Sequence, residues 1–181
     1  MTPIGVTVAA IVGLAIEGAA QAPVPRDGPA LADFERRVAA YVELHKRVAD
    51  NLPSLKLTDN PAEIAGRETA LGGAIRAARS GAGRGDIMTP QVAGLFQRAI
   101  RIDFRRRSRE ERQAMMEDIP RFRPIVNQTY PSEWPLATFP AGLLEVMPPL
   151  PEILEYRLLS ESLILRDVPA NIVVDFILNV Y

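Results

Sequence analysis

The chain of 181 residues contains no cysteine. This excludes a disulfide framework, a thiolate nucleophile and a sulfur-ligated metal site. Histidine is almost absent too, and any histidine-based catalysis or metal binding has to use His45. The net charge of −1 argues against a partner recognised by charge over the whole protein, such as nucleic acid. The composition predicts no cofactor.

The sequence also lacks the common catalytic and nucleotide-binding motifs. The stretch GAGRGD at residues 81–86 has neither the Lys-Ser/Thr pair of a P-loop nor the spacing of a dinucleotide fingerprint, and we interpret it as a flexible surface loop. No serine lies in a nucleophile elbow. Acidic residues in or beside the expected strands have the spacing of exposed edges and turns; they are Glu155, Glu161, Asp167 and Asp175. No catalytic residue is predicted, and a hydrolytic enzyme is the least favoured class of function.

The last thirty residues carry the clearest structural pattern. Three apolar runs of strand length, at 154–159, 163–167 and 172–177, are separated by residues typical of turns. They predict a small antiparallel meander over residues 152–181. We expect its buried faces to come from Tyr156, Leu158, Leu163, Leu165, Val174 and Phe176. Asp167 and Asp175 flank the last turn, where we expect them to pair with Arg157 or Arg166 across strands. A sheet this small needs helices to cover one face.

The first twenty residues predict export. Residues 4–16 form an uncharged apolar run that is shorter than a membrane span, and small residues follow it. We expect a cleaved signal peptide over residues 1–20 and a flexible lead-in over 21–28, which places the protein in the periplasm or outside the cell. A membrane anchor over residues 4–22, or a buried N-terminal helix, is the alternative.

Four helices are expected between residues 29 and 119. The first has apolar residues three and four apart from Leu31 to Leu52, and His45 continues this stripe. There the imidazole is expected to be structural and to need a partner for its ring N–H; a functional histidine is the alternative. The second begins after Asn60, ends near Gly81 and carries Ile64, Leu71, Ile75 and Ala78 on one face, with two interior glycines, Gly72 and Gly73, that close packing would explain.

The third helix begins at Thr89-Pro90, and a capping box of Ser108 and Glu111 begins a short fourth one. The proline-rich segment 120–151 is expected to wrap around the domain with one short helix at 141–147. Helices followed by strands predict a single α+β domain over residues 29–181.

Two groups of side chains are candidates for binding. Arg98, Arg101 and Arg105 share a face of the third helix, and such a row binds phosphate, anionic glycans or lipid head groups. Interleaved acids, such as Asp103 beside Arg107, make a solvated, internally paired helix the favoured reading. The second group is a partner surface of aromatic residues in the proline-rich segment, with clamping of that segment onto the core as the favoured alternative; its members are Tyr130, Trp134 and Phe139.

The chain resembles a group of exported bacterial proteins of unknown function. The resemblance is carried by the apolar leader and by four segments: AAYVELHKRVADNLPSLK, DNPAEIAGRETALGGAIRAAR, GDIMTPQVAGLFQRAIRIDFRRRS and PPLPEILEYRLLSESLILRDVPANIVVDFI. It implies export but no activity. The terminal strands are also similar to the terminal hairpin of small periplasmic proteins of nickel and cobalt homeostasis, which lack a helical body of this kind.

From these patterns we predict an exported, non-catalytic interaction module that binds a protein partner in the cell envelope. A periplasmic protein that binds an anion or a metal is the alternative. No metal site is assigned.

Overall fold

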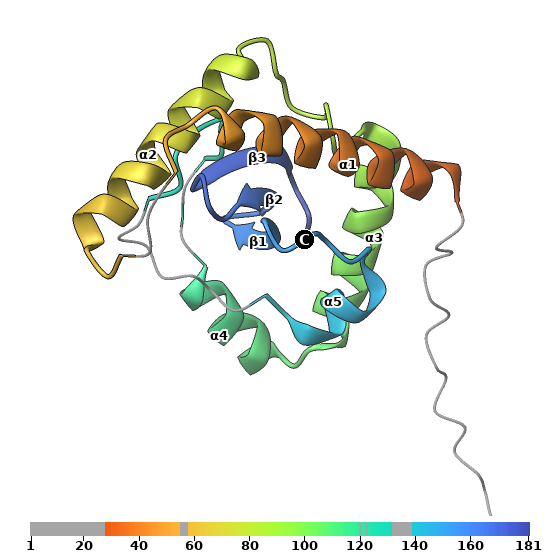
Figure 1. The fold of residues 1–181 in the computed structure, drawn as a ribbon. Coiled ribbons are helices and arrows are strands. Elements are labelled where there is room, and N and C mark those ends of the chain that lie inside the picture. Colours follow the sequence, from red (N-terminus) through yellow and green to blue (C-terminus); the bar gives the residue numbers. More distant parts are fainter. Residues whose placement is uncertain (1–27, 55–57, 120, 122, 132–138) are drawn as a thin grey trace, which may run out of the picture.

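A computed structural model describes residues 28–54, 58–119, 121, 123–131 and 139–181. Within these ranges the chain is an α+β domain with a three-stranded sheet after a series of helices. The sheet lies at the centre of the domain, and the helices are arranged around it (Figure 1). The helices are α1 (Pro29–Asp50), α2 (Pro61–Ala78), α3 (Pro90–Arg106), α4 (Arg109–Asp118) and α5 (Ala141–Val146).

Proline and capping residues fix where the helices begin. α1, α2 and α3 each begin at a proline, whose missing N–H costs nothing in the first turn of a helix. Asn60 caps α2 by accepting a bond from the Ala62 N–H. Ser108 and Glu111 form the predicted capping box at the start of α4.

The second helix differs from the prediction. Ile64 is 49% exposed, and Ala78 is exposed as well. The buried side of α2 runs through Leu71, Gly72 and Ile75. This shift follows from the close approach of α2 to the turn between β2 and β3, because a Cβ atom on Gly72 would lie 2.7 Å from the Ala170 carbonyl oxygen.

The strands are β1 (Leu154–Leu159), β2 (Ser162–Asp167) and β3 (Ile172–Ile177), paired antiparallel in the order β1-β2-β3. One face packs against α1, α2 and α3 in the main core. Its aromatic members meet edge to face, with ring centroids 5.3 Å apart for Phe34 and Phe96 and 6.0 Å apart for Phe96 and Tyr156. The other face contributes to a smaller cluster of Tyr130, Leu159, Ile164 and Val173.

A β-bulge in β3 corrects one predicted face. Arg166 pairs with Val173 while Leu165 pairs with Asp175, so Val174 is an extra residue in the strand. Val174 therefore joins the main core, whereas Phe176 lies on the opposite face, packed against the smaller cluster. The bulge also turns Asp175 toward the helices, to the same side as Leu165.

Candidate functional site

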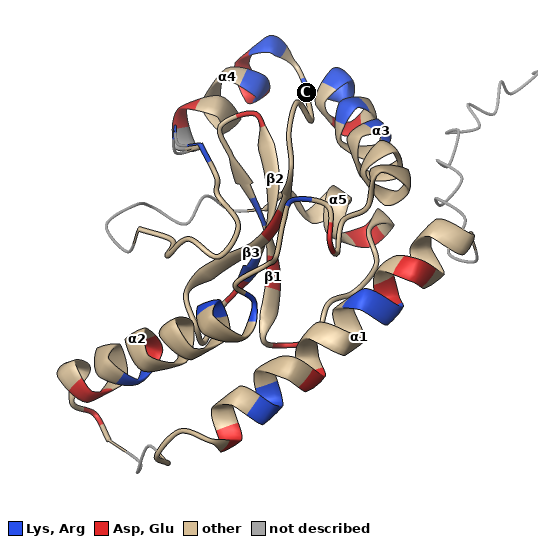
Figure 2. Ribbon diagram, turned by 90° about the horizontal axis from the view of Figure 1, so that it is seen from above, with Lys and Arg blue, Asp and Glu red and all other residues tan. Residues whose placement is uncertain are grey.

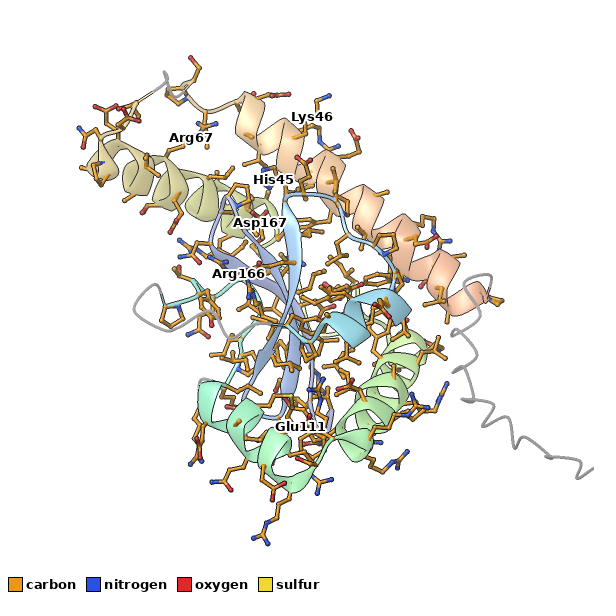
Figure 3. The ribbon with its side chains drawn as sticks, turned by 90° about the horizontal axis from the view of Figure 1, so that it is seen from below. His45, Lys46, Arg67, Glu111, Arg166 and Asp167 are labelled. Atoms are coloured by element: carbon orange, nitrogen blue, oxygen red, sulfur yellow. The ribbon has the colours of Figure 1, made fainter. Side chains whose placement is uncertain are left out.

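A fully buried carboxylate joins α1 to the sheet. Asp167 in β2 accepts bonds at one oxygen, Oδ2, from Tyr41 Oη (2.6 Å) and from His45 Nδ1 (2.6 Å). Its other oxygen accepts the Ala170 N–H at 2.8 Å. Tyr41 and His45 lie one helical turn apart, so both reach the same carboxylate from one face of α1. Figure 3 shows His45 directed from α1 toward Asp167.

The hydrogen-bond donors and acceptors of this cluster can be assigned. An ionised carboxylate only accepts hydrogen bonds, so His45 carries its proton on Nδ1 when it bonds Asp167. A carboxylate that holds a histidine in this way also occurs in catalytic and metal sites. However, the described residues contain no group of three or more His, Cys, Asp or Glu side chains that could hold a metal ion. Burial, with a smaller contribution from Asp167, raises the pKa of Tyr41 far above its usual range, so the phenol stays neutral and donates.

A second buried carboxylate holds the glycine-rich loop. Asp175 accepts the backbone N–H groups of Gly85 at 2.9 Å and of Ile87 and Met88, both at 2.8 Å. Its side chain is completely buried, so these bonds replace the water that an ionised group would otherwise keep. The loop at residues 81–88 is thereby fixed beside β3 as part of the fold.

Arg79, at the end of α2, bonds to the segment 127–129, which runs along the outer edge of β3. Its guanidinium donates to Asn127 Oδ1 at 2.8 Å and to the Val174 carbonyl at 3.1 Å, and it lies over the Tyr41 ring, 5.2 Å from the centroid. Asn127 returns a bond from Nδ2 to the Arg79 carbonyl at 2.8 Å. Burial lowers the pKa of Arg79, although nearby Tyr41 and acidic groups oppose this effect.

The cross-strand ion pairs differ from those predicted from the sequence. Arg166 binds Glu155 across the two strands at 2.6 Å, and Arg157 binds it within β1, also at 2.6 Å. Asp167 and Asp175 are fully buried rather than at exposed edges, and each carboxylate bonds to α1 or to the glycine-rich loop as well as to a near neighbour in the sequence. Arg166 lies on the opposite face of the sheet and also binds Asn171 Oδ1 at 2.7 Å; in Figure 3 it lies farther from α1 than Asp167 does.

The described residues cover the outer edge of β3 over only part of its length. The Val173 N–H donates to the Gln128 carbonyl, and the Val173 carbonyl accepts the Asn127 N–H. The covering segment runs antiparallel, with Thr129 opposite Ile172, and passes beside β3 in Figure 1. Continued in this direction it would bring the residues before Asn127 opposite the second half of β3.

Those earlier residues diverge from β3 instead. The Val168 N–H in the β2–β3 turn points toward β1, where it bonds the Ile153 carbonyl. Because backbone groups alternate in direction along a strand, the N–H and carbonyl of Ile164 also point toward β1, and those of Leu163 and Leu165 point toward β3. Phe176 pairs with Ile164, and its own N–H and carbonyl therefore point away from β2, as do those of Leu178 two residues later. The Phe176 N–H is bonded to Asp175 Oδ1, and the Leu178 carbonyl accepts Gln97 Nε2. The Phe176 carbonyl and the Leu178 N–H point outward between them.

A groove lies beside this open end of β3. It has a volume of about 640 Å³ and is bounded by the glycine-rich loop and by residues 123–126. Apolar side chains line it, including Ile125, which is 61% exposed. Arg84 and Arg123 are the charged residues of its lining. We call this surface the β3 groove; the residues that line it are Ala82, Gly83, Arg84, Arg123, Pro124, Ile125, Val126, Phe176 and Leu178.

The predicted arginine row is part exposed and part used within the fold. Arg98 and Arg105 are exposed on α3, whereas Arg101 donates to the Asn179 carbonyl at 2.7 Å. Basic residues gather on the C-terminal half of α3 with an acidic residue among them (Figure 2). The predicted ion pair of Asp103 and Arg107 is present, with 2.8 Å between Oδ2 and Nε.

Two of the three aromatic residues proposed as a partner surface are buried. Tyr130 and Phe139 are 2% and 8% exposed, and Phe139 packs in the main core. Their burial agrees with the alternative, in which they clamp the proline-rich segment onto the core. Trp134 lies outside the described residues.

Comparisons with known proteins identify no relative. No family model matches the chain, and no curated protein or solved structure matches it either. Among the helices of the described residues, none is both long enough and apolar enough to cross a membrane.

Proposed function

We propose that the protein is a non-catalytic interaction module that binds an extended segment of a partner protein in the β3 groove. The observation that carries this proposal is the end of β3 that no other described residue covers, where the Phe176 carbonyl and the Leu178 N–H point outward beside the groove. Addition of a strand to such an edge is a common way to bind a peptide, because main-chain bonds give affinity and side-chain pockets give specificity.

The buried polar groups favour binding over catalysis. The carboxylates of Asp167 and Asp175 and the guanidinium of Arg79 each bond to other elements of the same chain. These bonds hold the helices, the loop and the sheet in place, which makes the groove a rigid surface. The alternatives from the sequence were an anion or metal binder and a hydrolytic enzyme; for a metal binder, the described residues contain no group of three or more side chains that could hold the ion.

The proposed place of action is the cell envelope. This part of the proposal rests on the apolar run at residues 4–16, which is typical of a signal peptide. Cell fractionation with the intact mass of the recovered protein tests it. A chain that begins near Gln21 in the periplasmic fraction is expected, and a full-length chain in the cytosol would refute export.

Selection from a library of random displayed peptides tests the binding surface. Wild-type protein serves as bait, and Leu178→Pro, which removes the outward N–H, serves for counter-selection. We expect extended sequences that bind wild-type protein and lose affinity for Leu178→Pro and Ile125→Lys. Ile64→Lys is the matched control, because Ile64 is an exposed isoleucine on α2, and it should bind normally. Peptides that bind all of these variants equally, or no selected peptide, would refute the proposed surface.

A further inference from the structure

The charge of the β3 groove is opposite in sign to that of the whole chain. Among the described residues, its lining beside Phe176 contains two cations, Arg84 and Arg123, and no acidic side chain. The adjoining hollow adds Arg121 and Glu161, so the combined surface is positive, whereas the chain carries a net charge of −1. A cleft lined by one sign of charge raises the local concentration of ligands of the other sign.

The two arginines have donors to offer a ligand. Both side chains are exposed, and neither forms a hydrogen bond or ion pair with a residue that the structure describes. The Arg84 guanidinium carbon lies 5.9 Å from the centroid of the Phe176 ring. A guanidinium that rests on an aromatic ring keeps the N–H groups at its edge available for a carboxylate.

From this arrangement we infer that the partner segment is acidic, with carboxylate side chains that bind Arg84 and Arg123 while its backbone pairs with β3. The inference rests on the proposed function and specifies the chemistry of the partner. A strand added at Phe176 and Leu178 would run between the loop that carries Arg84 and the segment that carries Arg123. Carboxylates on such a strand would meet an arginine on either side, and its apolar side chains would cover Ile125.

A second copy of the chain fits this groove less well. Antiparallel pairing of two β3 edges about a two-fold axis would bring Arg84 and Arg123 of each copy close to the same arginines of the other. Like charges placed opposite each other across strands are destabilising. The arginines that would repel a second copy of the chain would attract an acidic segment.

Three acetylated octapeptides test the inference by fluorescence anisotropy: alternating glutamate and valine, alternating glutamine and valine, and alternating lysine and valine. We expect the glutamate peptide to bind wild-type protein about two- to thirtyfold more tightly than the glutamine peptide, since each of two exposed charge contacts contributes a small amount and the two add. The lysine peptide should bind most weakly. This preference should decrease at high salt.

Variants separate the acidic preference from binding itself. The double variant Arg84→Gln, Arg123→Gln should bind the glutamate and glutamine peptides equally. Arg47→Gln replaces an exposed arginine of α1 and should keep the wild-type preference. Leu178→Pro should weaken both peptides.

Equal binding of the two peptides to wild-type protein would overturn the inference and leave the proposed function standing. Failure of all three peptides to bind would overturn both. Displacement of the glutamate peptide by free glutamate or phosphate at comparable concentration would mean a simple anion site, and would overturn the inference as well.

Discussion

Replacing each of two adjacent glycines of α2 by alanine should change stability in opposite directions. Gly72 and Gly73 both lie in the interior of α2, where alanine is the better helix former. A Cβ atom at position 72 would lie 2.7 Å from the Ala170 carbonyl oxygen and 3.4 Å from Ile172 Cγ2. At position 73 it would meet nothing within 4 Å. Gly72→Ala should therefore destabilise the protein, and Gly73→Ala should stabilise it.

The magnitude follows from two effects. Both substitutions gain about 0.5–1 kcal/mol of helix propensity. Only Gly72→Ala adds the cost of forcing α2 away from the backbone of the β2–β3 turn, and overpacking of this kind costs about 1–3 kcal/mol. The difference in the free energy of unfolding between the two variants is this second cost alone. It corresponds to a difference in Tm of about 2–12 °C for a domain of this size.

Urea denaturation followed by circular dichroism measures this difference, and thermal denaturation provides an independent check. Gly66→Ala, in the same helix and with no atom within 4 Å of its Cβ position, should behave like Gly73→Ala. Equal shifts of the midpoint for Gly72→Ala and Gly73→Ala would show that α2 does not approach the turn as closely as the structure places it.

Three further predictions concern the buried polar groups. Asp175→Ala should lower the free energy of unfolding, measured by urea denaturation, by about 3–5 kcal/mol because it leaves loop N–H groups buried without an acceptor. Asp86→Ala, at an exposed carboxylate of the same loop, should lower it by less than about 1 kcal/mol. Similar losses for the two variants would refute the role of Asp175. Tyr41→Phe should cost about 1.5–3 kcal/mol because it removes a donor to the charged Asp167, and an unchanged midpoint would contradict that bond. Burial opposes ionisation of Glu155, but its arginine partners hold the pKa of this carboxyl below its usual value. The contribution of Glu155 to the free energy of unfolding is therefore present above the unfolded pKa of about 4.3 and is lost as the pH falls through the lower folded pKa. The stability advantage of wild-type protein over Glu155→Gln should shrink on acidification, and a difference that stays constant with pH would refute this prediction.

The local sequence was sufficient to predict most of the secondary structure. A proline at the start of α1, α2 and α3 marks each beginning without reference to the rest of the chain, and so does the capping box of Ser108 and Glu111. The three strands follow from apolar runs separated by turn residues. These signals are local, because capping and strand alternation depend on residues a few positions apart.

The polar interior was not predictable in the same way. Asp167 is the last residue of β2 and Asp175 lies within β3, and aspartate is rarely fully buried. Their partners in α1 and in the glycine-rich loop lie 122 and 126 residues away for Asp167 and about 90 residues away for Asp175, so no short-range pattern predicts these bonds. The bulge at Val174 is equally invisible, because it depends on the pairing register of β2 and β3. The one available signal was that a buried His45 needs a hydrogen-bond acceptor for its ring N–H. This requirement does not identify the residue that accepts.

The β3 groove could not be predicted from the sequence for a related reason. It exists because residues 127–130 follow the edge of β3 while residues 123–126 leave it. Pro124 marks the half that leaves the strand, because proline has no N–H to donate to a neighbouring strand, but the sequence does not show which strand the segment meets.

The position of the two buried aspartates late in the chain has a consequence for folding. During synthesis α1, α2 and α3 leave the ribosome well before Asp167 and Asp175, so the helices have neither the sheet surface nor the carboxylates that fix them. Contacts between residues so far apart in sequence form late and slow the folding of a domain. The helices therefore remain exposed until β2 and β3 have been made, and a chaperone or a translocation machinery that keeps chains unfolded would have this interval in which to act.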